Sequence, residues 1–313
     1  MALMARRVVH IHPTLLCNLT CAHCYSTSSP QMPRGLDPEH ILQATAKMAA
    51  DGYDSASLSG GEPTIYFGLD RLCGGLREQG FAVSVITNGL QPRRIAGFAD
   101  QHQPDLISVS FDGLAPRHDL IRRKQGSFDR AMETLKTLAD KGHACGAVVS
   151  LGEDGMEDIP ALVAQIAAAG ARHVQLHPVS ELGRGLTSAI VKEPSDETLL
   201  RAMVLSQLLD VIHPDCRIIC DALTGELLQA KPRPKVGDLV SPVVIGADGK
   251  VFPVAYGLAE HFSFGNVRDG LSPTVYAPEL VDLIDRCWDA AATREATAFY
   301  PDLTRLSQTL VPG

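Results

Sequence analysis

The stretch Cys17-Asn18-Leu19-Thr20-Cys21-Ala22-His23-Cys24 places three thiols close together, shortly after the apolar run Val8-Val9-His10-Ile11. Thiolates are soft ligands, so a group of three favours iron–sulfur or zinc over magnesium or calcium. A structural zinc site normally has four protein ligands in two separated pairs, and no second CxxC or HxxxH pair follows here. A [4Fe–4S] cluster held by three cysteines leaves one iron open to another ligand. The stretch therefore favours an iron–sulfur cluster; zinc completed by His10, His12 or His23, or simply buried cysteines, are the alternatives.

The CxxxCxxC spacing, with His23 directly before the last cysteine, resembles the cluster motif of the radical S-adenosylmethionine (SAM) superfamily. The resemblance implies that Cys17, Cys21 and Cys24 bind one [4Fe–4S] cluster, whose open iron chelates the amino and carboxylate groups of SAM. It also implies that one electron from the cluster cleaves SAM to methionine and a 5′-deoxyadenosyl radical, and that His23 lies near the adenine.

Length and composition fit one large α/β unit with an appendage. The chain has 313 residues, of which 45% are hydrophobic, and an α/β barrel takes about 200–250 residues. The net charge of -8 argues against a nucleic-acid-binding protein, which would show a basic patch. We find no signal peptide and no long apolar run, so we expect a cytoplasmic protein that does not interact with membranes. Eight cysteines, three of them clustered, indicate metal binding rather than a disulfide framework.

The first 180 residues alternate short apolar runs with Ala-rich amphipathic stretches. We expect six strands, over Val8–His12, Ser55–Ser59, Ala82–Thr87, Leu106–Ser110, Cys145–Ser150 and His173–His177. The helices expected between them cover Pro38–Ala50, Leu69–Gln79, Pro92–Asp100, Phe128–Lys141 and Ile159–Ala169. Such repeats predict parallel strands joined by right-handed crossovers, and six are too few for a closed eight-stranded barrel. The predicted fold is α/β, a partial (β/α)6 barrel of the radical SAM type with its site at the carboxyl ends of the strands.

Two motifs follow the second and third expected strands. In Gly60-Gly61-Glu62-Pro63 the paired glycines let the backbone approach a ligand closely; an ordinary Gly-Pro turn is the alternative. This motif is similar to the family's GGEP, which implies that Gly60, Gly61 and Glu62 hold the amino group of SAM. Thr87-Asn88-Gly89 is similar to the TNG found at this position in many relatives.

Further candidates follow the fourth strand. Ser110-Phe111-Asp112-Gly113 is similar to the family's SxDG, which makes Ser110 a candidate contact for the methionine carboxylate or the ribose. Asp112 is less certain, because Asp-Gly also forms an ordinary turn. The segment from His118-Asp119 through Arg122-Arg123 to Gly126-Ser127-Phe128 resembles another family stretch. Arg122 there is a candidate to pair with the cofactor carboxylate, and an exposed basic turn is the alternative.

The segments after the fifth and sixth strands depart from the family or say less. Many relatives place an asparagine near the ribose after the fifth strand, whereas here the run is Val149-Ser150-Leu151-Gly152-Glu153. Ser150 or Glu153 would then hold the ribose. After the sixth strand, His177 is either a residue with a chemical role at the barrel mouth or a structural histidine.

Beyond residue 180 the pattern weakens. We expect a helix over Pro194–Ile212, a strand over Cys216–Cys220, a Pro/Lys-rich loop over Lys231–Lys235, a hairpin turning at Ala247–Lys250 and a helix over Pro278–Asp289. This layout resembles the SPASM or twitch extension of peptide-modifying radical enzymes, with Val254 where a cluster-ligating cysteine would stand. We therefore predict a barrel domain over residues 1–190 and a SPASM/twitch-like extension over residues 191–313 that lacks the usual cluster cysteines.

The other five cysteines are spread over the chain. Cys216, Cys220 and Cys287 could form an incomplete second metal site, although an auxiliary cluster normally has four cysteines. Cys73 and Cys145 fall in an expected helix and an expected strand, so we predict that they are small buried core residues.

The resemblance implies an enzyme that uses one [4Fe–4S] cluster and SAM to abstract hydrogen from a substrate, with a flavodoxin- or ferredoxin-type reductant. The extension favours a ribosomally made peptide as substrate, matured by cross-linking or epimerisation. A small metabolite or cofactor precursor is the alternative substrate. A non-catalytic metal-binding module is an alternative of another class, but it leaves the GGEP and SxDG motifs unexplained.

Only sixteen residues precede Cys17, too few for a winged-helix leader-binding domain at that end. We expect a peptide substrate either to lie directly across the barrel mouth or to be delivered by a separate leader-binding protein. Such a partner could take up the leader by strand addition.

Overall fold

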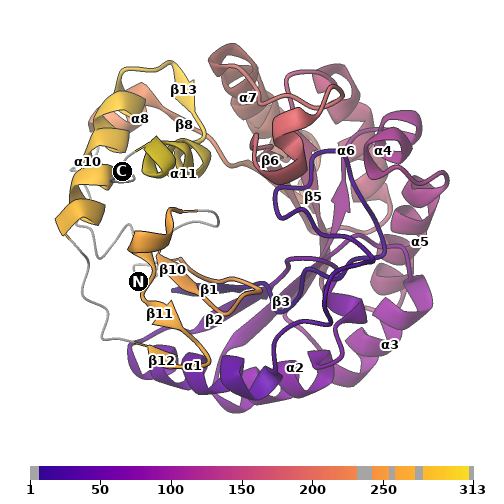
Figure 1. Ribbon diagram of the computed structural model, residues 1–313. Coiled ribbons are helices and arrows are strands. Elements are labelled where there is room, and N and C mark those ends of the chain that lie inside the picture. Colours follow the sequence, from indigo (N-terminus) through magenta and orange to yellow (C-terminus); the bar gives the residue numbers. More distant parts are fainter. Residues whose placement is uncertain (1–6, 231–241, 254–257, 272–277, 310–313) are drawn as a thin grey trace.

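The structure, a computed structural model, describes residues 7–230, 242–253, 258–271 and 278–309. One curved sheet runs through it, and helices line the outside of the curve (Figure 1). The six predicted strands are all present, with ends within one residue of the prediction. They are β1 (Val8–Ile11), β2 (Ser55–Leu58), β3 (Ala82–Thr87), β4 (Leu106–Phe111), β5 (Cys145–Leu151) and β6 (His173–Pro178).

These six strands lie side by side in sequence order, and each pairs in parallel with the next. Parallel neighbours need a crossover connection, and here the crossovers contain the predicted helices. The prediction of an α/β partial barrel is therefore confirmed. Because all six strands run the same way, the loops after them gather at one edge of the sheet.

The C-terminal part of the chain extends this sheet at both edges, which the prediction of six strands did not include. β7 (Arg217–Cys220) pairs in parallel with β6, and β9 (Val243–Ile245) pairs in parallel with β1. β10 (Val251–Pro253) then pairs antiparallel with β9 and completes the predicted hairpin. The nine-stranded order is β10-β9-β1-β2-β3-β4-β5-β6-β7. An open sheet leaves unpaired N–H and C=O groups along its edge strands, and β7 and β9 pair with those of β6 and β1.

The helices between the strands match the prediction to within two residues at each end. They are α1 (Pro38–Ala50), α2 (Leu69–Glu78), α3 (Pro92–His102), α5 (Ser127–Asp140) and α6 (Ile159–Ala168). α1 begins at Asp37, whose carboxylate accepts a hydrogen bond from the Glu39 N–H, and Pro38 takes the first helical position. The prediction missed the short helix α4 (Ala115–Arg122) between β4 and α5.

Side chains alternate between the two faces of the sheet. One set is apolar and buried against the helices; Val9, Val83, Val109 and Val149 belong to it. The other set faces the inside of the curve and contains many polar side chains, including Ser57, Ser84, Ser108, Ser110, Ser150, His10, Gln175 and His177. The inner face therefore offers hydroxyl and imidazole groups.

The C-terminal helices have a hydrophobic cluster of their own. After the long helix α7 (Asp196–Ile212) come α8 (Gly225–Ala230), α10 (Pro278–Ala292) and α11 (Phe299–Thr309). Buried residues of the last three, Trp288 and Leu303 among them, share one cluster that is distinct from that of the sheet. None of the helices described combines the length and apolar composition that a membrane span requires. The predicted loop over Lys231–Lys235 and Val254 lie outside the described residues.

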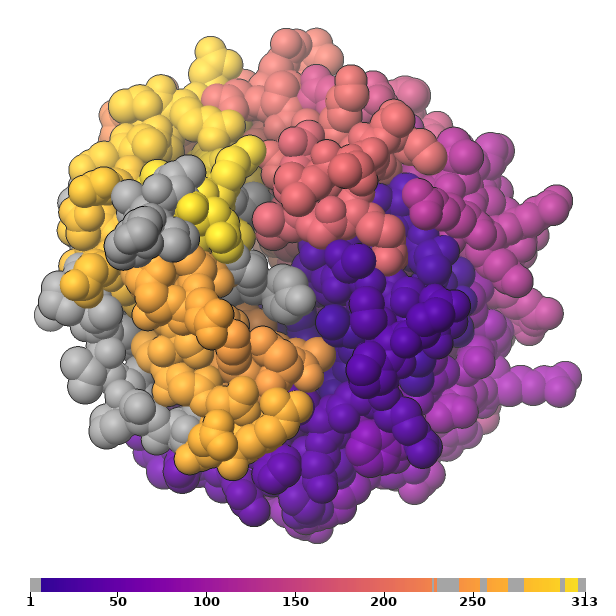
Figure 2. Space-filling model, viewed as in Figure 1, coloured from indigo at the N-terminus to yellow at the C-terminus, as the bar shows by residue number. Residues whose placement is uncertain are grey.

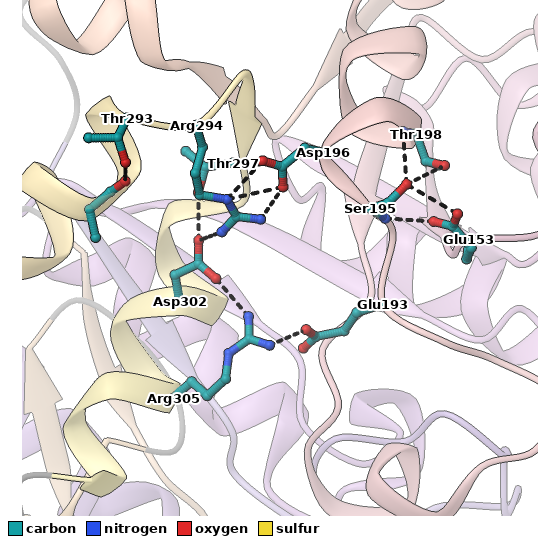
Figure 3. A network of polar contacts seen from close by, with 11 residues as sticks. Glu153, Glu193, Ser195, Asp196, Thr198, Thr293, Arg294, Thr297, Asp302 and Arg305 are labelled. Carbon is teal, nitrogen blue, oxygen red and sulfur yellow. Dashed lines mark hydrogen bonds and ion pairs between the residues drawn. The ribbon is translucent and has the colours of Figure 1, made fainter.

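Ion pairs link these C-terminal helices to the start of α7 (Figure 3). Arg294, which follows α10, pairs with Asp196 at the start of α7 and with Asp302 of α11. Arg305 of α11 pairs with Asp302 and with Glu193, which precedes α7. Two arginines and three carboxylates thus connect segments about 100 residues apart in the sequence.

His10, a half-buried histidine on the inner face, makes the free energy of unfolding depend on pH. Its pKa is lowered from 6.5 to about 4, mainly by loss of solvation and also by the neighbouring His177, while Asp221 opposes the shift. The unfolded chain therefore binds more protons than the folded one between pH 6.5 and about 4, so folding stability falls as pH drops through this window. Between pH 7 and pH 5, the wild type should lose free energy of unfolding. We expect His10→Gln to lose less of it, by up to about 2 kcal/mol.

Urea unfolding at the two pH values measures this difference. His261→Gln, which changes an exposed histidine, serves as the control and should lose as much stability as the wild type. Equal losses in His10→Gln and the wild type would contradict the expectation.

Candidate functional site

The three predicted cluster ligands lie on an irregular segment over residues 12–37, which we call the cysteine segment. It leaves the carboxyl end of β1 and leads to α1. Cys17 and Cys21 are buried, Cys24 is half-buried, and all three are free thiols. They pack with Leu19 and Leu90 in a small cluster apart from the main core. In the space-filling view, the N-terminal segment (indigo) covers much of the middle of one face (Figure 2). Three free thiols are thus gathered at the edge where the strands end.

These thiols suit a multi-iron cluster better than a single ion. Within the described ranges, no group of three or more His, Cys, Asp or Glu side chains is arranged to hold a single metal ion. The cysteines of a [4Fe–4S] cluster bind different irons, so they need not converge on one point. Burial raises the pKa of the Cys17 thiol to about 12 and also raises that of Cys21. Bound metal cations would offset this by favouring the thiolates.

The predicted Gly60-Gly61-Glu62 motif is in direct contact with the cysteine segment. The Gly61 N–H donates to the Thr14 carbonyl at 2.8 Å, and the Glu62 N–H donates to the Leu16 carbonyl at 2.9 Å. Gly60 has φ +101°, and a Cβ on Gly61 would collide with the Leu16 carbonyl. The two glycines therefore allow a close approach between the loop after β2 and the cysteine segment.

The Glu62 carboxylate is buried and is held by three donor residues. One oxygen accepts hydrogen bonds from the Thr64 N–H (3.1 Å), the Thr64 hydroxyl (2.6 Å) and the Thr87 hydroxyl (2.7 Å). Among the described residues, the other oxygen accepts only from the Asn88 N–H, at 2.8 Å, and so has room for another donor such as an ammonium group. The Asn88 amide also donates to Asn18 at 2.7 Å, within the cysteine segment. The TNG motif pointed to Asn88, but the sequence analysis assigned this residue no role.

The buried carboxylate of Asp112 binds two side chains, one of which, His23, belongs to the cysteine segment. Both of its oxygens accept hydrogen bonds from the Arg122 guanidinium, and one also accepts from His23 Nε2 at 2.8 Å. These positive and polar partners hold the pKa of Asp112 well below its usual range although burial acts in the opposite direction. Arg122 is 6% exposed, so it is not the exposed basic turn that was the alternative. Its pairing with a cofactor carboxylate stays a prediction, and Asp112 matters more than the sequence suggested.

Two other residues of the Arg122 motif have structural contacts. His118 Nδ1 accepts a hydrogen bond from the Asp112 N–H at 3.2 Å. The Asp119 carboxylate accepts from the Gly126 N–H (2.6 Å), the Ser127 hydroxyl (2.8 Å) and the Phe128 N–H (2.9 Å). Asp119 thus binds the free N–H groups at the start of α5. Much of this motif serves to join α4 to α5.

The other candidates for cofactor contacts lie in different surroundings. Ser110 is half-buried on the inner face near the end of β4, and the Ser150 hydroxyl lies 3.3 Å from His23 Nε2. Ser150 is therefore near the cysteine segment. Glu153 instead binds the N–H and hydroxyl of Ser195, at the start of α7 (Figure 3). Of the two residues expected at the ribose, Ser150 is the better placed.

His177 is oriented by a carboxylate that the sequence analysis did not identify. His177 Nδ1 donates to Asp221 at 2.7 Å, and the Gln175 amide donates to the same oxygen at 2.5 Å. Asp221 follows directly after β7 and was missed because β7 was not expected beside β6. The His177 side chain is 56% exposed. An imidazole whose Nδ1 is fixed by a carboxylate can transfer a proton through Nε2.

The remaining cysteines do not gather into a second site in the described part of the chain. Cys73 and Cys145 are buried core residues, as predicted. Cys216 packs in the core of the sheet, whereas Cys287 belongs to the separate C-terminal cluster. No group that could hold a metal ion includes them within the described residues.

Comparisons with known proteins agree with this geometry. Residues 11–166 match the family model of the Radical SAM superfamily. Sporulation killing factor maturation protein SkfB of Bacillus subtilis (strain 168) is 30% identical over 159 residues, which are 50% of this chain and 39% of that protein. Antilisterial bacteriocin subtilosin biosynthesis protein AlbA of the same organism is 24% identical over 282 residues, 89% of this chain and 60% of that protein. Fe-coproporphyrin III synthase of Methanosarcina barkeri is 31% identical over 157 residues, 50% of this chain and 39% of that protein.

This chain thus spans less than two thirds of the length of each of these relatives. Among solved structures, SuiB of Streptococcus suis is similar with a TM-score of 0.64 and 18% identity, over 79% of this chain and 59% of that one. At this identity the similarity shows a shared fold. The family implies a [4Fe–4S] cluster and SAM as cofactors. With three free cysteines at the carboxyl edge of a parallel partial barrel, this chain belongs to the radical SAM superfamily.

Proposed function

We propose that this protein is an enzyme that binds one [4Fe–4S] cluster through Cys17, Cys21 and Cys24 and uses it with SAM to abstract hydrogen from a substrate. The observation that carries the proposal is the placement of the three free cysteines beside the Gly60–Glu62 segment. The Gly61 and Glu62 N–H groups donate hydrogen bonds to the stretch directly before Cys17. When bound, the cluster would supply the electron that cleaves SAM to methionine and a 5′-deoxyadenosyl radical.

The surrounding residues have distinct roles in this proposal. Gly60, Gly61 and Glu62 would bind the amino end of SAM, because one Glu62 oxygen accepts only a single hydrogen bond from the described residues. Ser110 would contact the carboxylate or ribose, and His23, fixed by Asp112, would lie near the adenine. The burial of Cys17 and Cys21 would limit the access of water to these two ligands.

We propose a ribosomally made peptide as the substrate class. Two relatives are named for the maturation of a killing factor and for bacteriocin biosynthesis. SuiB, which shares the fold, has been solved with its precursor peptide SuiA. A separate leader-binding protein and a flavodoxin- or ferredoxin-type reductant are the partners proposed for this activity.

A small metabolite or cofactor precursor is the second candidate substrate. Fe-coproporphyrin III synthase, another relative, is named for a porphyrin product. The genes beside this one discriminate the two candidates, since a short precursor gene favours a peptide and a metabolic cluster favours a small molecule. A titration of this chain with the linked precursor and with its leader alone then tests the peptide directly.

Iron analysis tests the cluster assignment. Anaerobic reconstitution should give about four irons per chain, the content of one [4Fe–4S] cluster. Replacing Cys17, Cys21 and Cys24 together by Ala should abolish this iron, because the ligands are lost. The triple replacement of Cys73, Cys145 and Cys287 by Ala is the control for cysteine number and should keep it if the protein folds. About eight irons in the wild type, or four surviving in the first variant, would refute the assignment.

SAM binding tests the role of Glu62. In the reconstituted protein, Glu62→Ala should weaken SAM binding by about 2–5 kcal/mol, since a buried ammonium would lose its carboxylate. Equilibrium dialysis measures the affinity, and chromatography measures the 5′-deoxyadenosine released after reduction. Glu39→Ala, at an exposed glutamate on α1, is the control and should bind SAM normally. Wild-type affinity in a folded Glu62→Ala variant would show that the assignment is wrong.

A further inference from the structure

Arg184 binds the cysteine segment from a part of the chain far away in the sequence. It lies in the short 3-10 helix Gly183–Thr187, which follows β6. Its Nε donates to the Cys21 carbonyl at 2.8 Å, and its Nη2 donates to the Ser28 carbonyl at 2.7 Å. Its backbone N–H donates to the Cys24 carbonyl at 3.0 Å. One residue thus contacts the carbonyls of two of the three cysteines.

The glycines on either side of Arg184 bring its backbone against this segment. Gly183 has φ +54°, and a Cβ there would collide with the Tyr25 carbonyl. A Cβ on Gly185 would lie 2.8 Å from the Ser180 carbonyl, closer than real side chains allow. Larger residues at either position would therefore move Arg184 away from Cys21 and Cys24.

Among the described residues, no carboxylate forms an ion pair with Arg184. The guanidinium hydrogen-bonds there to backbone carbonyls. Arg122 also lies near Cys21, but its charge is balanced by Asp112. A guanidinium stays protonated at any ordinary pH. Arg184 therefore places a positive charge, with no paired carboxylate among the described residues, beside the Cys21 and Cys24 end of the segment.

We propose that Arg184 is a positioning residue that holds this charge beside the Cys21 and Cys24 ligands and makes the cluster easier to reduce. The inference rests on the proposed function. Three thiolates already make the site negative, and reduction adds one electron. A fixed nearby cation stabilises the reduced state more than the oxidised state, and net charge and hydrogen bonds are among the factors that set the potentials of iron–sulfur clusters.

The test compares Arg184→Gln, which removes the charge, with Arg184→Lys, which keeps it. Each variant is reconstituted anaerobically as the full chain, its iron is measured, and its midpoint potential is determined by titration with dithionite as electron donor, followed by electron paramagnetic resonance. Arg201→Gln is the control, because Arg201 is an exposed arginine on α7 paired with Glu197. Circular dichroism shows that each variant is folded.

We expect Arg184→Gln to have a more negative midpoint potential than the wild type, and Arg184→Lys and Arg201→Gln to stay close to it. If Arg184→Gln cannot hold the cluster, retention of iron by Arg184→Lys supports the proposal. Unchanged potential in a fully loaded Arg184→Gln variant overturns it, as does equal loss of iron in both Arg184 variants. A wild-type protein without a cluster would instead refute the proposed function, so the two failures are distinct.

Discussion

The irregular segment between β1 and α1 is the part of this protein on which the rest of the site depends. Backbone N–H and C=O groups that are buried outside regular structure need partners from elsewhere. Here the partners come from the loop after β2 through Gly61 and Glu62, from α4 through Ile121, and from the segment after β6 through Arg184. The position of the cysteine segment therefore depends on the loops after several strands together.

The two arginines beside this segment, Arg122 and Arg184, have different partners. Asp112 is fully buried and binds both Arg122 and His23, so this group is stable only as a unit, because removing one partner of a buried pair leaves an unpaired charge. Arg184, on the other hand, is bound only to carbonyl oxygens in the described structure. Arg122 thus neutralises a buried acid, whereas Arg184 has its positive charge beside the cysteine segment.

The C-terminal region contributes to the barrel as well as forming a cluster of its own. β7 and β9 lengthen the sheet at its two edges, while α8, α10 and α11 pack around a separate hydrophobic cluster. β7 also brings Asp221 beside His177. The predicted division into residues 1–190 and 191–313 remains a proposal, and strands from the second part complete the sheet of the first.

The sequence by itself determined the six early strands, the main helices between them and the position of the cysteine site. Alternating apolar runs located all six early strands within one residue, because side-chain period and turn residues are local properties. The order of strands and helices then placed the CxxxCxxC and GGEP motifs at one edge of the sheet. Only the tertiary structure decided which distant groups meet: β9 with β1, Asp221 with His177, Asp112 with Arg122, and Arg184 with Cys21. These pairings join residues that no local pattern connects, since a buried polar group in an irregular loop can be satisfied by any donor that the folded chain brings within reach.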